Sequence, residues 1–123
     1  MIQTAQALIP QESASAGLKA AMTILDKWGC SAEQQWLILG MRKSSYYKNR
    51  DNTDSAHLSG DQLERISYIL NMHAALRVVF DNPENLYGFM AMKNNNPYFY
   101  GASPLDIIGS GNLGDLYETY KRI

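Results

Sequence analysis

Apolar residues in the first third of the chain recur every three or four positions, in short groups separated by glycine. Those between 15 and 28 lie on one face and predict a helix that Gly29 ends. Ser31 and Gln34 have the spacing of a capping box, in which each side chain bonds a backbone N–H near the helix start. A second helix therefore begins there and stops at Gly40, since glycine adopts a positive φ at a sharp turn without steric cost.

A third, short helix is predicted for residues 44–50, with a polar loop at 51–55 after it. The longest periodic stretch begins at Ser59 or Asp61 and reaches Phe80, and it predicts one long helix that joins the two halves of the chain. Its apolar stripe consists of Leu63, Ile66, Ile69, Leu70, Met72, Leu76, Val79 and Phe80.

The last third combines short helices with an aromatic loop. A helix is expected at 84–92, and the Asn-rich aromatic segment 93–102 is a loop. Residues 103–106 place an N-cap serine, a proline at the first helical position and an acid in the first turn, so a short helix begins there. A final helix starts at Gly111 or Asn112.

These elements predict an all-α protein. We expect a flexible arm at 1–14, a helix-turn-helix region at 15–58, and a linking helix with a small C-terminal helical domain at 59–123. The 123 residues, 46% of them hydrophobic, suffice for one core or two small ones. No apolar run reaches the roughly 20 residues of a membrane span, no secretory signal is evident, and the single cysteine, Cys30, forms no internal disulfide. A cytoplasmic location is therefore expected.

Charge is distributed unevenly along the chain. Residues 1–50 carry six Lys or Arg against three acids, whereas 51–123 carry five against nine. Residues 42–50 contain four positive charges and no negative one, a concentration that suits a polyanionic partner. A solvated charged turn is the alternative interpretation.

The helix pair around Gly40 has the spacing of a helix-turn-helix, in which a first helix braces a second that enters the major groove. We expect Tyr46 to fill the angle between the two helices, with the bulky Trp36 altering how they dock. Outward-facing Ser44, Ser45, Tyr47 and Lys48 would contact base edges or sugars, and Arg42, Lys43 and Arg50 would contact phosphates. An ordinary helical hairpin with a basic tip would have the same spacing.

Catalytic and metal-binding chemistry is not supported by the sequence. His57 and His73 have no cysteine pair or acid cluster at metal-ligand spacing, and Cys30 lacks an evident activating base. We expect no metal and no cofactor, and His73 as a core or interface residue with a satisfied hydrogen bond. In the Tyr98-Phe99-Tyr100 run, Phe99 is expected in the core and at least one tyrosine exposed for a protein partner.

Three segments carry a resemblance to a known family. They are 58–66, 76–80, and the pattern Asn96-Pro97-x-Phe99-x-Gly101-x-Ser103-Pro104-Leu105 that continues through Gly111 and Leu116-Tyr117. Together they resemble the Xre/MbcA/ParS antitoxins over roughly residues 18–123, and 44–48 resembles the recognition helix of their Xre-like domain. The family's usual Arg-Pro-Asn before the aromatic loop is Lys93-Asn94-Asn95-Asn96 here.

This resemblance implies a non-catalytic antitoxin whose C-terminal domain covers the active-site entrance of a RES-domain toxin, an enzyme that consumes NAD or transfers its ADP-ribose. It also implies a homodimer that binds the operator of its own operon. Carried onto this chain, the toxin-facing residues are Asn96, Pro97, Phe99, Tyr100, Gly101, Leu105, Tyr117, Tyr120, Lys121 and Arg122. The alternative is a stand-alone helix-turn-helix regulator whose C-terminal half only dimerises, and a toxin gene in the adjacent reading frame would distinguish the two.

Overall fold

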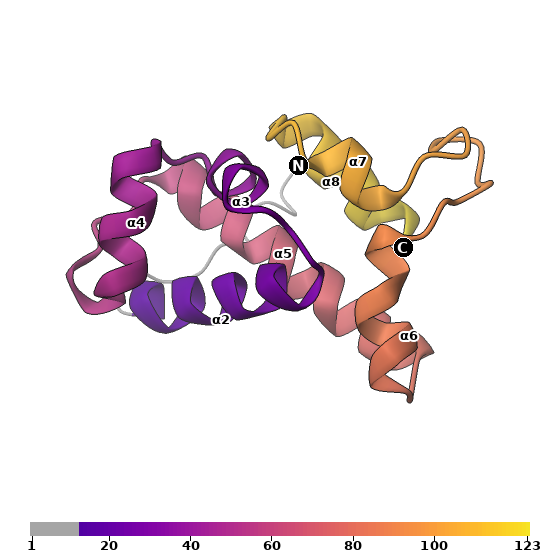
Figure 1. Ribbon diagram of the computed structural model, residues 1–123, viewed down its shortest axis with the longest axis horizontal. Coiled ribbons are helices and arrows are strands. Elements are labelled where there is room, and N and C mark those ends of the chain that lie inside the picture. The colour runs from indigo at the N-terminus through magenta and orange to yellow at the C-terminus, as the bar shows by residue number, and fades with distance from the viewer. Residues whose placement is uncertain (1–12) are drawn as a thin grey trace.

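The computed structural model describes residues 13–123, and every regular element in this range is helical, which confirms the all-α class (Figure 1). The α-helices are α2 (Ala14–Lys27), α3 (Ala32–Leu39), α4 (Lys43–Asp51), α5 (Gly60–Val79), α6 (Pro83–Gly88), α7 (Pro104–Ile108) and α8 (Leu113–Arg122), and the short 3₁₀ turns are η2 (Thr53–Ser55) and η3 (Phe89–Ala91). Most of the predicted arm 1–14 lies outside the described residues, but Ala14 is the first, buried residue of α2.

The long helix α5 is the centre of the fold. It contacts α2 and α3 in the N-terminal half and α6 and α8 in the C-terminal half, and in Figure 1 it runs from behind α4 to α6. One hydrophobic cluster includes fully buried side chains from both halves: Leu18, Leu25, Ile38, Leu39, Ile66, Ile69, Met72, Leu76, Met90, Ile108 and Leu116. Because these side chains share one core, the two halves are packed together rather than merely linked.

The helix starts have a common chemical basis. Ser31, Ser59 and Ser103 each accept a hydrogen bond from the backbone N–H three residues on, and Gln34, Gln62 and Asp106 return one to the cap, so that three capping boxes are complete. Gly40 ends α3 with φ +69°, as its position predicted. Local sequence therefore determines most of the helix boundaries.

Three expectations need correction. The helix predicted at 84–92 divides into α6 and η3, and the loop at 51–55 contains η2. Val79, placed in the buried stripe of α5, is 67% exposed. The stripe stops there because α5 ends at Val79 and Phe80 has an extended backbone, which brings its ring within 5.8 Å of Phe89.

Candidate functional site

The helix-turn-helix pair consists of α3 and α4, and Tyr46 lies between them as predicted. Tyr46 is 2% exposed, and its hydroxyl donates a hydrogen bond of 2.8 Å to Oε1 of Gln35, which is 3% exposed. Gln35 Nε2 in turn donates to Asp26 Oδ1 on α2 over 2.8 Å. A buried polar chain thus joins three helices, and such chains define one geometry when every member is paired.

Arg50 completes this chain from the last turn of α4. Its guanidinium donates to the Tyr46 hydroxyl over 3.0 Å and to Gln35 Oε1 over 3.2 Å, and it forms an ion pair with Asp26. The hydrogen bond with Asp26 raises the pKa of Arg50. Arg50 was predicted to contact phosphate, but its donors are directed into the protein, so we leave it out of the proposed DNA surface.

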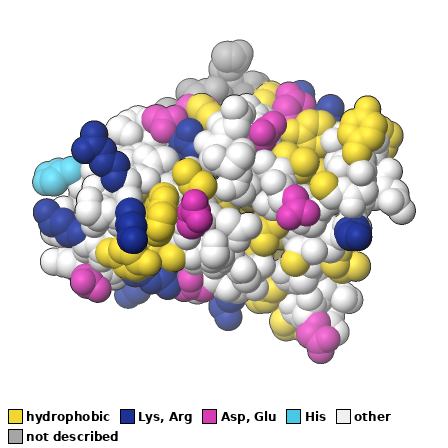
Figure 2. Space-filling model, turned by 45° about the horizontal axis from the view of Figure 1, so that its top comes forward, with side chains coloured by type: hydrophobic (Ala, Val, Ile, Leu, Met, Phe, Trp, Pro, Cys, Tyr) yellow, Lys and Arg dark blue, Asp and Glu magenta, His cyan; other side chains and the backbone are white. Residues whose placement is uncertain are grey.

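The opposite side of α4 is polar and cationic. Ser44, Ser45, Tyr47 and Lys48 are exposed, as predicted, together with Arg42 and Lys43. Within residues 13–123, none of Arg42, Lys43 and Lys48 forms a salt bridge. Figure 2 shows Lys and Arg side chains gathered at the end of the molecule where α4 lies. This surface has the charge that a nucleic-acid backbone attracts.

Trp36 is accommodated by aromatic packing. Its ring meets Tyr46 edge-on at a centroid distance of 6.0 Å and Tyr47 at 6.2 Å, while the two tyrosine rings are 5.2 Å apart. The Lys43 ammonium lies 5.9 Å from the Trp36 ring. Edge-to-face contacts are a favourable arrangement for such rings, so the bulky residue supports the helix pair.

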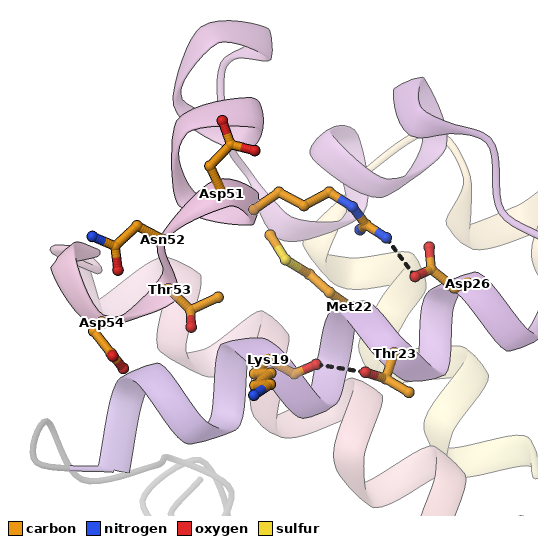
Figure 3. A pocket seen from close by; sticks show the side chains of 9 residues that line it. Lys19, Met22, Thr23, Asp26, Asp51, Asn52, Thr53 and Asp54 are labelled. Atoms are coloured by element: carbon orange, nitrogen blue, oxygen red, sulfur yellow. Dashed lines mark hydrogen bonds and ion pairs between the residues drawn. The ribbon is translucent and has the colours of Figure 1, made fainter.

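A polar cavity of about 380 Å³ lies behind α4 (Figure 3). Its lining comes from α2 and from residues 50–54, and it includes Lys19, Thr23, Asp26 and Asp54. The ion pair between Arg50 and Asp26 forms part of its wall. In the described range no group of three or more His, Cys, Asp or Glu side chains is placed to hold a metal ion.

The aromatic loop is a closed structure rather than an extended strand of chain. The Asn94 N–H donates to the Ala102 carbonyl over 3.0 Å, and the Gly101 N–H donates to the Asn94 carbonyl over 2.9 Å. Phe99 is buried beneath the loop, as expected. Tyr100 is 92% exposed and has φ +51°, a conformation that costs a non-glycine residue energy. The loop therefore holds one aromatic side chain outward on a buried aromatic base.

Tyr98 connects the loop to α8. Its hydroxyl donates to Asp115 Oδ1 over 3.3 Å, and the Arg122 guanidinium lies 4.6 Å from its ring centroid. Arg122 also bonds Glu118 Oε1 over 2.7 Å. The sequence analysis did not select Tyr98, although it stands in the same aromatic run as Tyr100. The loop and the last helix consequently form one surface.

The predicted toxin-facing residues divide by exposure. The exposed ones are Asn96, Pro97, Tyr100, Tyr117, Lys121 and Arg122. Phe99 and Leu105 are buried, and Tyr120 is half-buried with its ring 6.0 Å from that of Tyr68. Gly101 is partly covered and has φ +83°, which turns the loop back. The buried members can shape this surface but cannot be its contact residues.

Two other residues have different environments from an active site. Nδ1 of His73 is buried and finds no hydrogen-bond partner within residues 13–123, so the predicted satisfied hydrogen bond is wrong; the ring instead stacks on Tyr87 at 5.7 Å. Burial, with a smaller contribution from Asp26, raises the pKa of the Cys30 thiol to about 12. A thiol with such a pKa is a poor nucleophile at neutral pH.

A buried tyrosine between two short helices and a cationic outer face on the second define a small helix-turn-helix protein. Residues 7–71 match the family described as antitoxin Xre-like helix-turn-helix domain, and the chain belongs to this family. The chain is also 34% identical over 105 residues to the uncharacterized protein y4oB of Sinorhizobium fredii, covering 85% of this chain and 78% of the relative.

No solved structure matches the chain. None of the helices between residues 13 and 123 combines the length and hydropathy that a membrane span requires.

Proposed function

We propose that this protein is an antitoxin with two binding surfaces: α4 binds the operator of its own operon, and the aromatic loop with α8 binds and occludes the active site of a RES-domain toxin. The observation that carries the proposal is the separation of the two surfaces. Figure 1 places α4 and the loop 93–102 at opposite ends of the molecule, so that DNA and a protein partner can be bound at once.

For the DNA surface, the support is the chemistry of the outer face of α4. Ser44, Ser45 and Tyr47 are short or rigid hydrogen-bonding groups suited to base edges and sugars, and Arg42, Lys43 and Lys48 supply positive charge for phosphates. A helix-turn-helix of this kind binds as a dimer, and we propose a homodimer on an operator with half-sites one helical turn, or a multiple of it, apart.

For the toxin surface, the support is the presentation of Tyr100. Tyrosine is enriched among the residues that dominate protein interfaces, because it buries a large, rigid side chain with one polar end. Strained backbone is retained where the surrounding structure determines it, and here the two hydrogen bonds between Asn94 and residues 101–102 do so. Lys121 and Arg122, exposed in the last turn of α8, add positive charge beside the loop.

The proposed partner is an enzyme that degrades NAD or transfers its ADP-ribose, and the antitoxin contributes no chemistry of its own. Occlusion requires only that the loop and α8 fill the entrance of the toxin's cleft. The exposed contact residues would be Asn96, Pro97, Tyr100, Tyr117, Lys121 and Arg122, with Phe99, Gly101, Leu105 and Tyr120 holding them in place.

Two tyrosine variants provide a reciprocal test. The toxin is co-expressed from the adjacent reading frame, and growth rescue and operator binding are measured for Tyr47→Ala and Tyr100→Ala. We expect Tyr100→Ala to lose growth rescue and keep operator binding, and Tyr47→Ala to do the reverse. Both residues are exposed tyrosines, so each variant is the matched control of the other.

Two results would contradict the proposal. Rescue by Tyr100→Ala at the wild-type level would remove the loop from the toxin interface. Operator binding without any toxin in the neighbouring frame would instead favour a stand-alone regulator whose C-terminal half dimerises.

A further inference from the structure

Arg65 joins the two halves of the protein from within α5. Its side chain is 12% exposed, and its Nη1 donates to three backbone carbonyls: Leu37 over 3.3 Å, Ile38 over 3.2 Å and Gly111 over 2.6 Å. Its Nε bonds Asp61 over 2.9 Å. Leu37 and Ile38 belong to the last turn of α3, whereas Gly111 lies in the turn between α7 and α8.

The segments around this guanidinium are in very close contact. A Cβ added at Gly111 would lie 2.4 Å from the Leu37 carbonyl oxygen, and one added at Gly40 would lie 2.8 Å from Arg65 Nε. Gln62 Nε2 also donates to the Gly40 carbonyl over 3.1 Å. The end of α3 and the turn into α4 are therefore enclosed by α5 on one side and by the C-terminal turn on the other.

These contacts have a physical reason. The last carbonyls of a helix have no intrahelical partner, and a cation at this end also interacts favourably with the helix dipole. Arg65 supplies both, and it adds the Gly111 carbonyl to the same group. Since α4 begins only three residues after Gly40, the position of the α3 end decides the direction in which α4 leaves the turn.

We infer that Arg65 is a positioning residue for operator binding, and that through it the affinity for DNA depends on the C-terminal turn at Gly109–Gly111. This inference rests on the proposed function of α4. Arg65 acts without touching DNA, because its side chain is enclosed between α3, α5 and the C-terminal turn.

The test compares Arg65→Gln, Arg65→Lys and Gly111→Ala with Arg77→Gln, a control that removes an exposed arginine from the same helix. Operator affinity is measured by fluorescence anisotropy over a range of salt concentrations, and folding is checked by thermal melting. We expect Arg65→Gln and Gly111→Ala to lower operator affinity about 10-fold or more, by analogy with the loss of buried hydrogen bonds to a charged group. Arg65→Lys should lie between them and the wild type, and Arg77→Gln should match the wild type.

The salt dependence separates positioning from direct contact. A lost phosphate contact reduces the slope of log affinity against log salt by about one, whereas a misplaced helix lowers affinity without that signature. We expect folded Arg65→Gln to keep the wild-type slope. A slope reduced by about one would overturn the inference, and so would wild-type operator affinity in folded Arg65→Gln.

If Arg65→Gln fails to fold, Gly111→Ala decides the matter. Folded Gly111→Ala with wild-type operator affinity would overturn the inference and leave the proposed function intact. A wild-type protein with no affinity for its operator would overturn both.

Discussion

The hydroxyl of Tyr46 and the side-chain carbonyl of Gln35 are 2.8 Å apart, and both residues are buried. This hydrogen bond links the second helix of the helix-turn-helix to the first. Arg50 and Asp26 extend it to α2. The orientation of the DNA-binding helix is thus determined by polar contacts behind it, while its outer face keeps its side chains for a ligand.

Replacing Tyr46 by phenylalanine should remove this contact and keep the ring. Gln35 Oε1 retains its hydrogen bond from Arg50, so the acceptor is not left unpaired. We expect the free energy of unfolding in urea to fall by about 1 kcal/mol, the usual net contribution of such a bond. Tyr47→Phe, on the exposed side of α4, is the control and should change stability little. Equal effects of the two variants would contradict the role of the Tyr46 hydroxyl.

Gly40→Ala should destabilise the protein. The position has φ +69°, which costs an L-residue about 1–2 kcal/mol, and the added Cβ would press on Arg65 Nε at 2.8 Å. Gly60→Ala is a matched control, because this helical glycine has nothing within 4 Å of its added Cβ. Urea denaturation should show a loss for Gly40→Ala and none for Gly60→Ala. A stable Gly40→Ala would show that the turn can be formed differently.

Lys48→Ala should weaken operator binding to all sequences by a similar factor and reduce the salt slope of binding by about one. The physical reason is the release of one condensed counterion fewer from the DNA. Anisotropy titrations on operator and unrelated DNA at several salt concentrations measure both quantities. Lys93→Ala, which removes an exposed lysine next to the aromatic loop, should leave the slope unchanged. An unchanged slope for Lys48→Ala would exclude a phosphate contact by this side chain.

His73 should make stability depend on pH in the acid range. Burial, followed by the charge of Arg77, lowers the pKa of His73 below the ordinary 6.5. The unfolded chain therefore binds a proton more readily, so the contribution is complete above about pH 6.5 and declines as the pH falls toward the folded pKa. His73→Phe keeps a ring against Tyr87 and removes the unpaired Nδ1.

Urea denaturation at pH 7 and at pH 5 measures this effect. The loss of stability between the two pH values should be smaller in His73→Phe than in the wild type. His57→Gln, which replaces an exposed histidine, should behave as the wild type does. The same pH dependence in wild type and His73→Phe would contradict the assignment.

Local chemistry made much of the fold predictable. The capping boxes at Ser31 and Ser103 and the glycine at 40 act within a few residues, so their effect on helix boundaries follows from the sequence. Periodicity likewise predicted the inward position of Tyr46. The division of 84–92 into α6 and η3 was not predictable in this way, because periodicity does not distinguish an α-helix from a 3₁₀ turn over so short a segment.

Contacts between distant residues could not be predicted. Arg50 falls within a basic run and has the composition of a phosphate contact, yet Asp26, twenty-four positions away in the sequence, turns it into the protein. Arg65 likewise has no local signal for its bond to Gly111, forty-six positions away. The exposure of Val79 also depends on where α5 ends relative to its neighbours.

The amino-acid sequence alone determined the helices, their caps, the basic segment and the aromatic loop, since each depends on residues within about two turns of one another. Only the tertiary structure decided which cations remain available to a ligand, which tyrosine points outward, and how the C-terminal turn meets the DNA-binding helices. These properties depend on hydrogen bonds and packing between segments brought together by the common core, and no local pattern encodes such pairs.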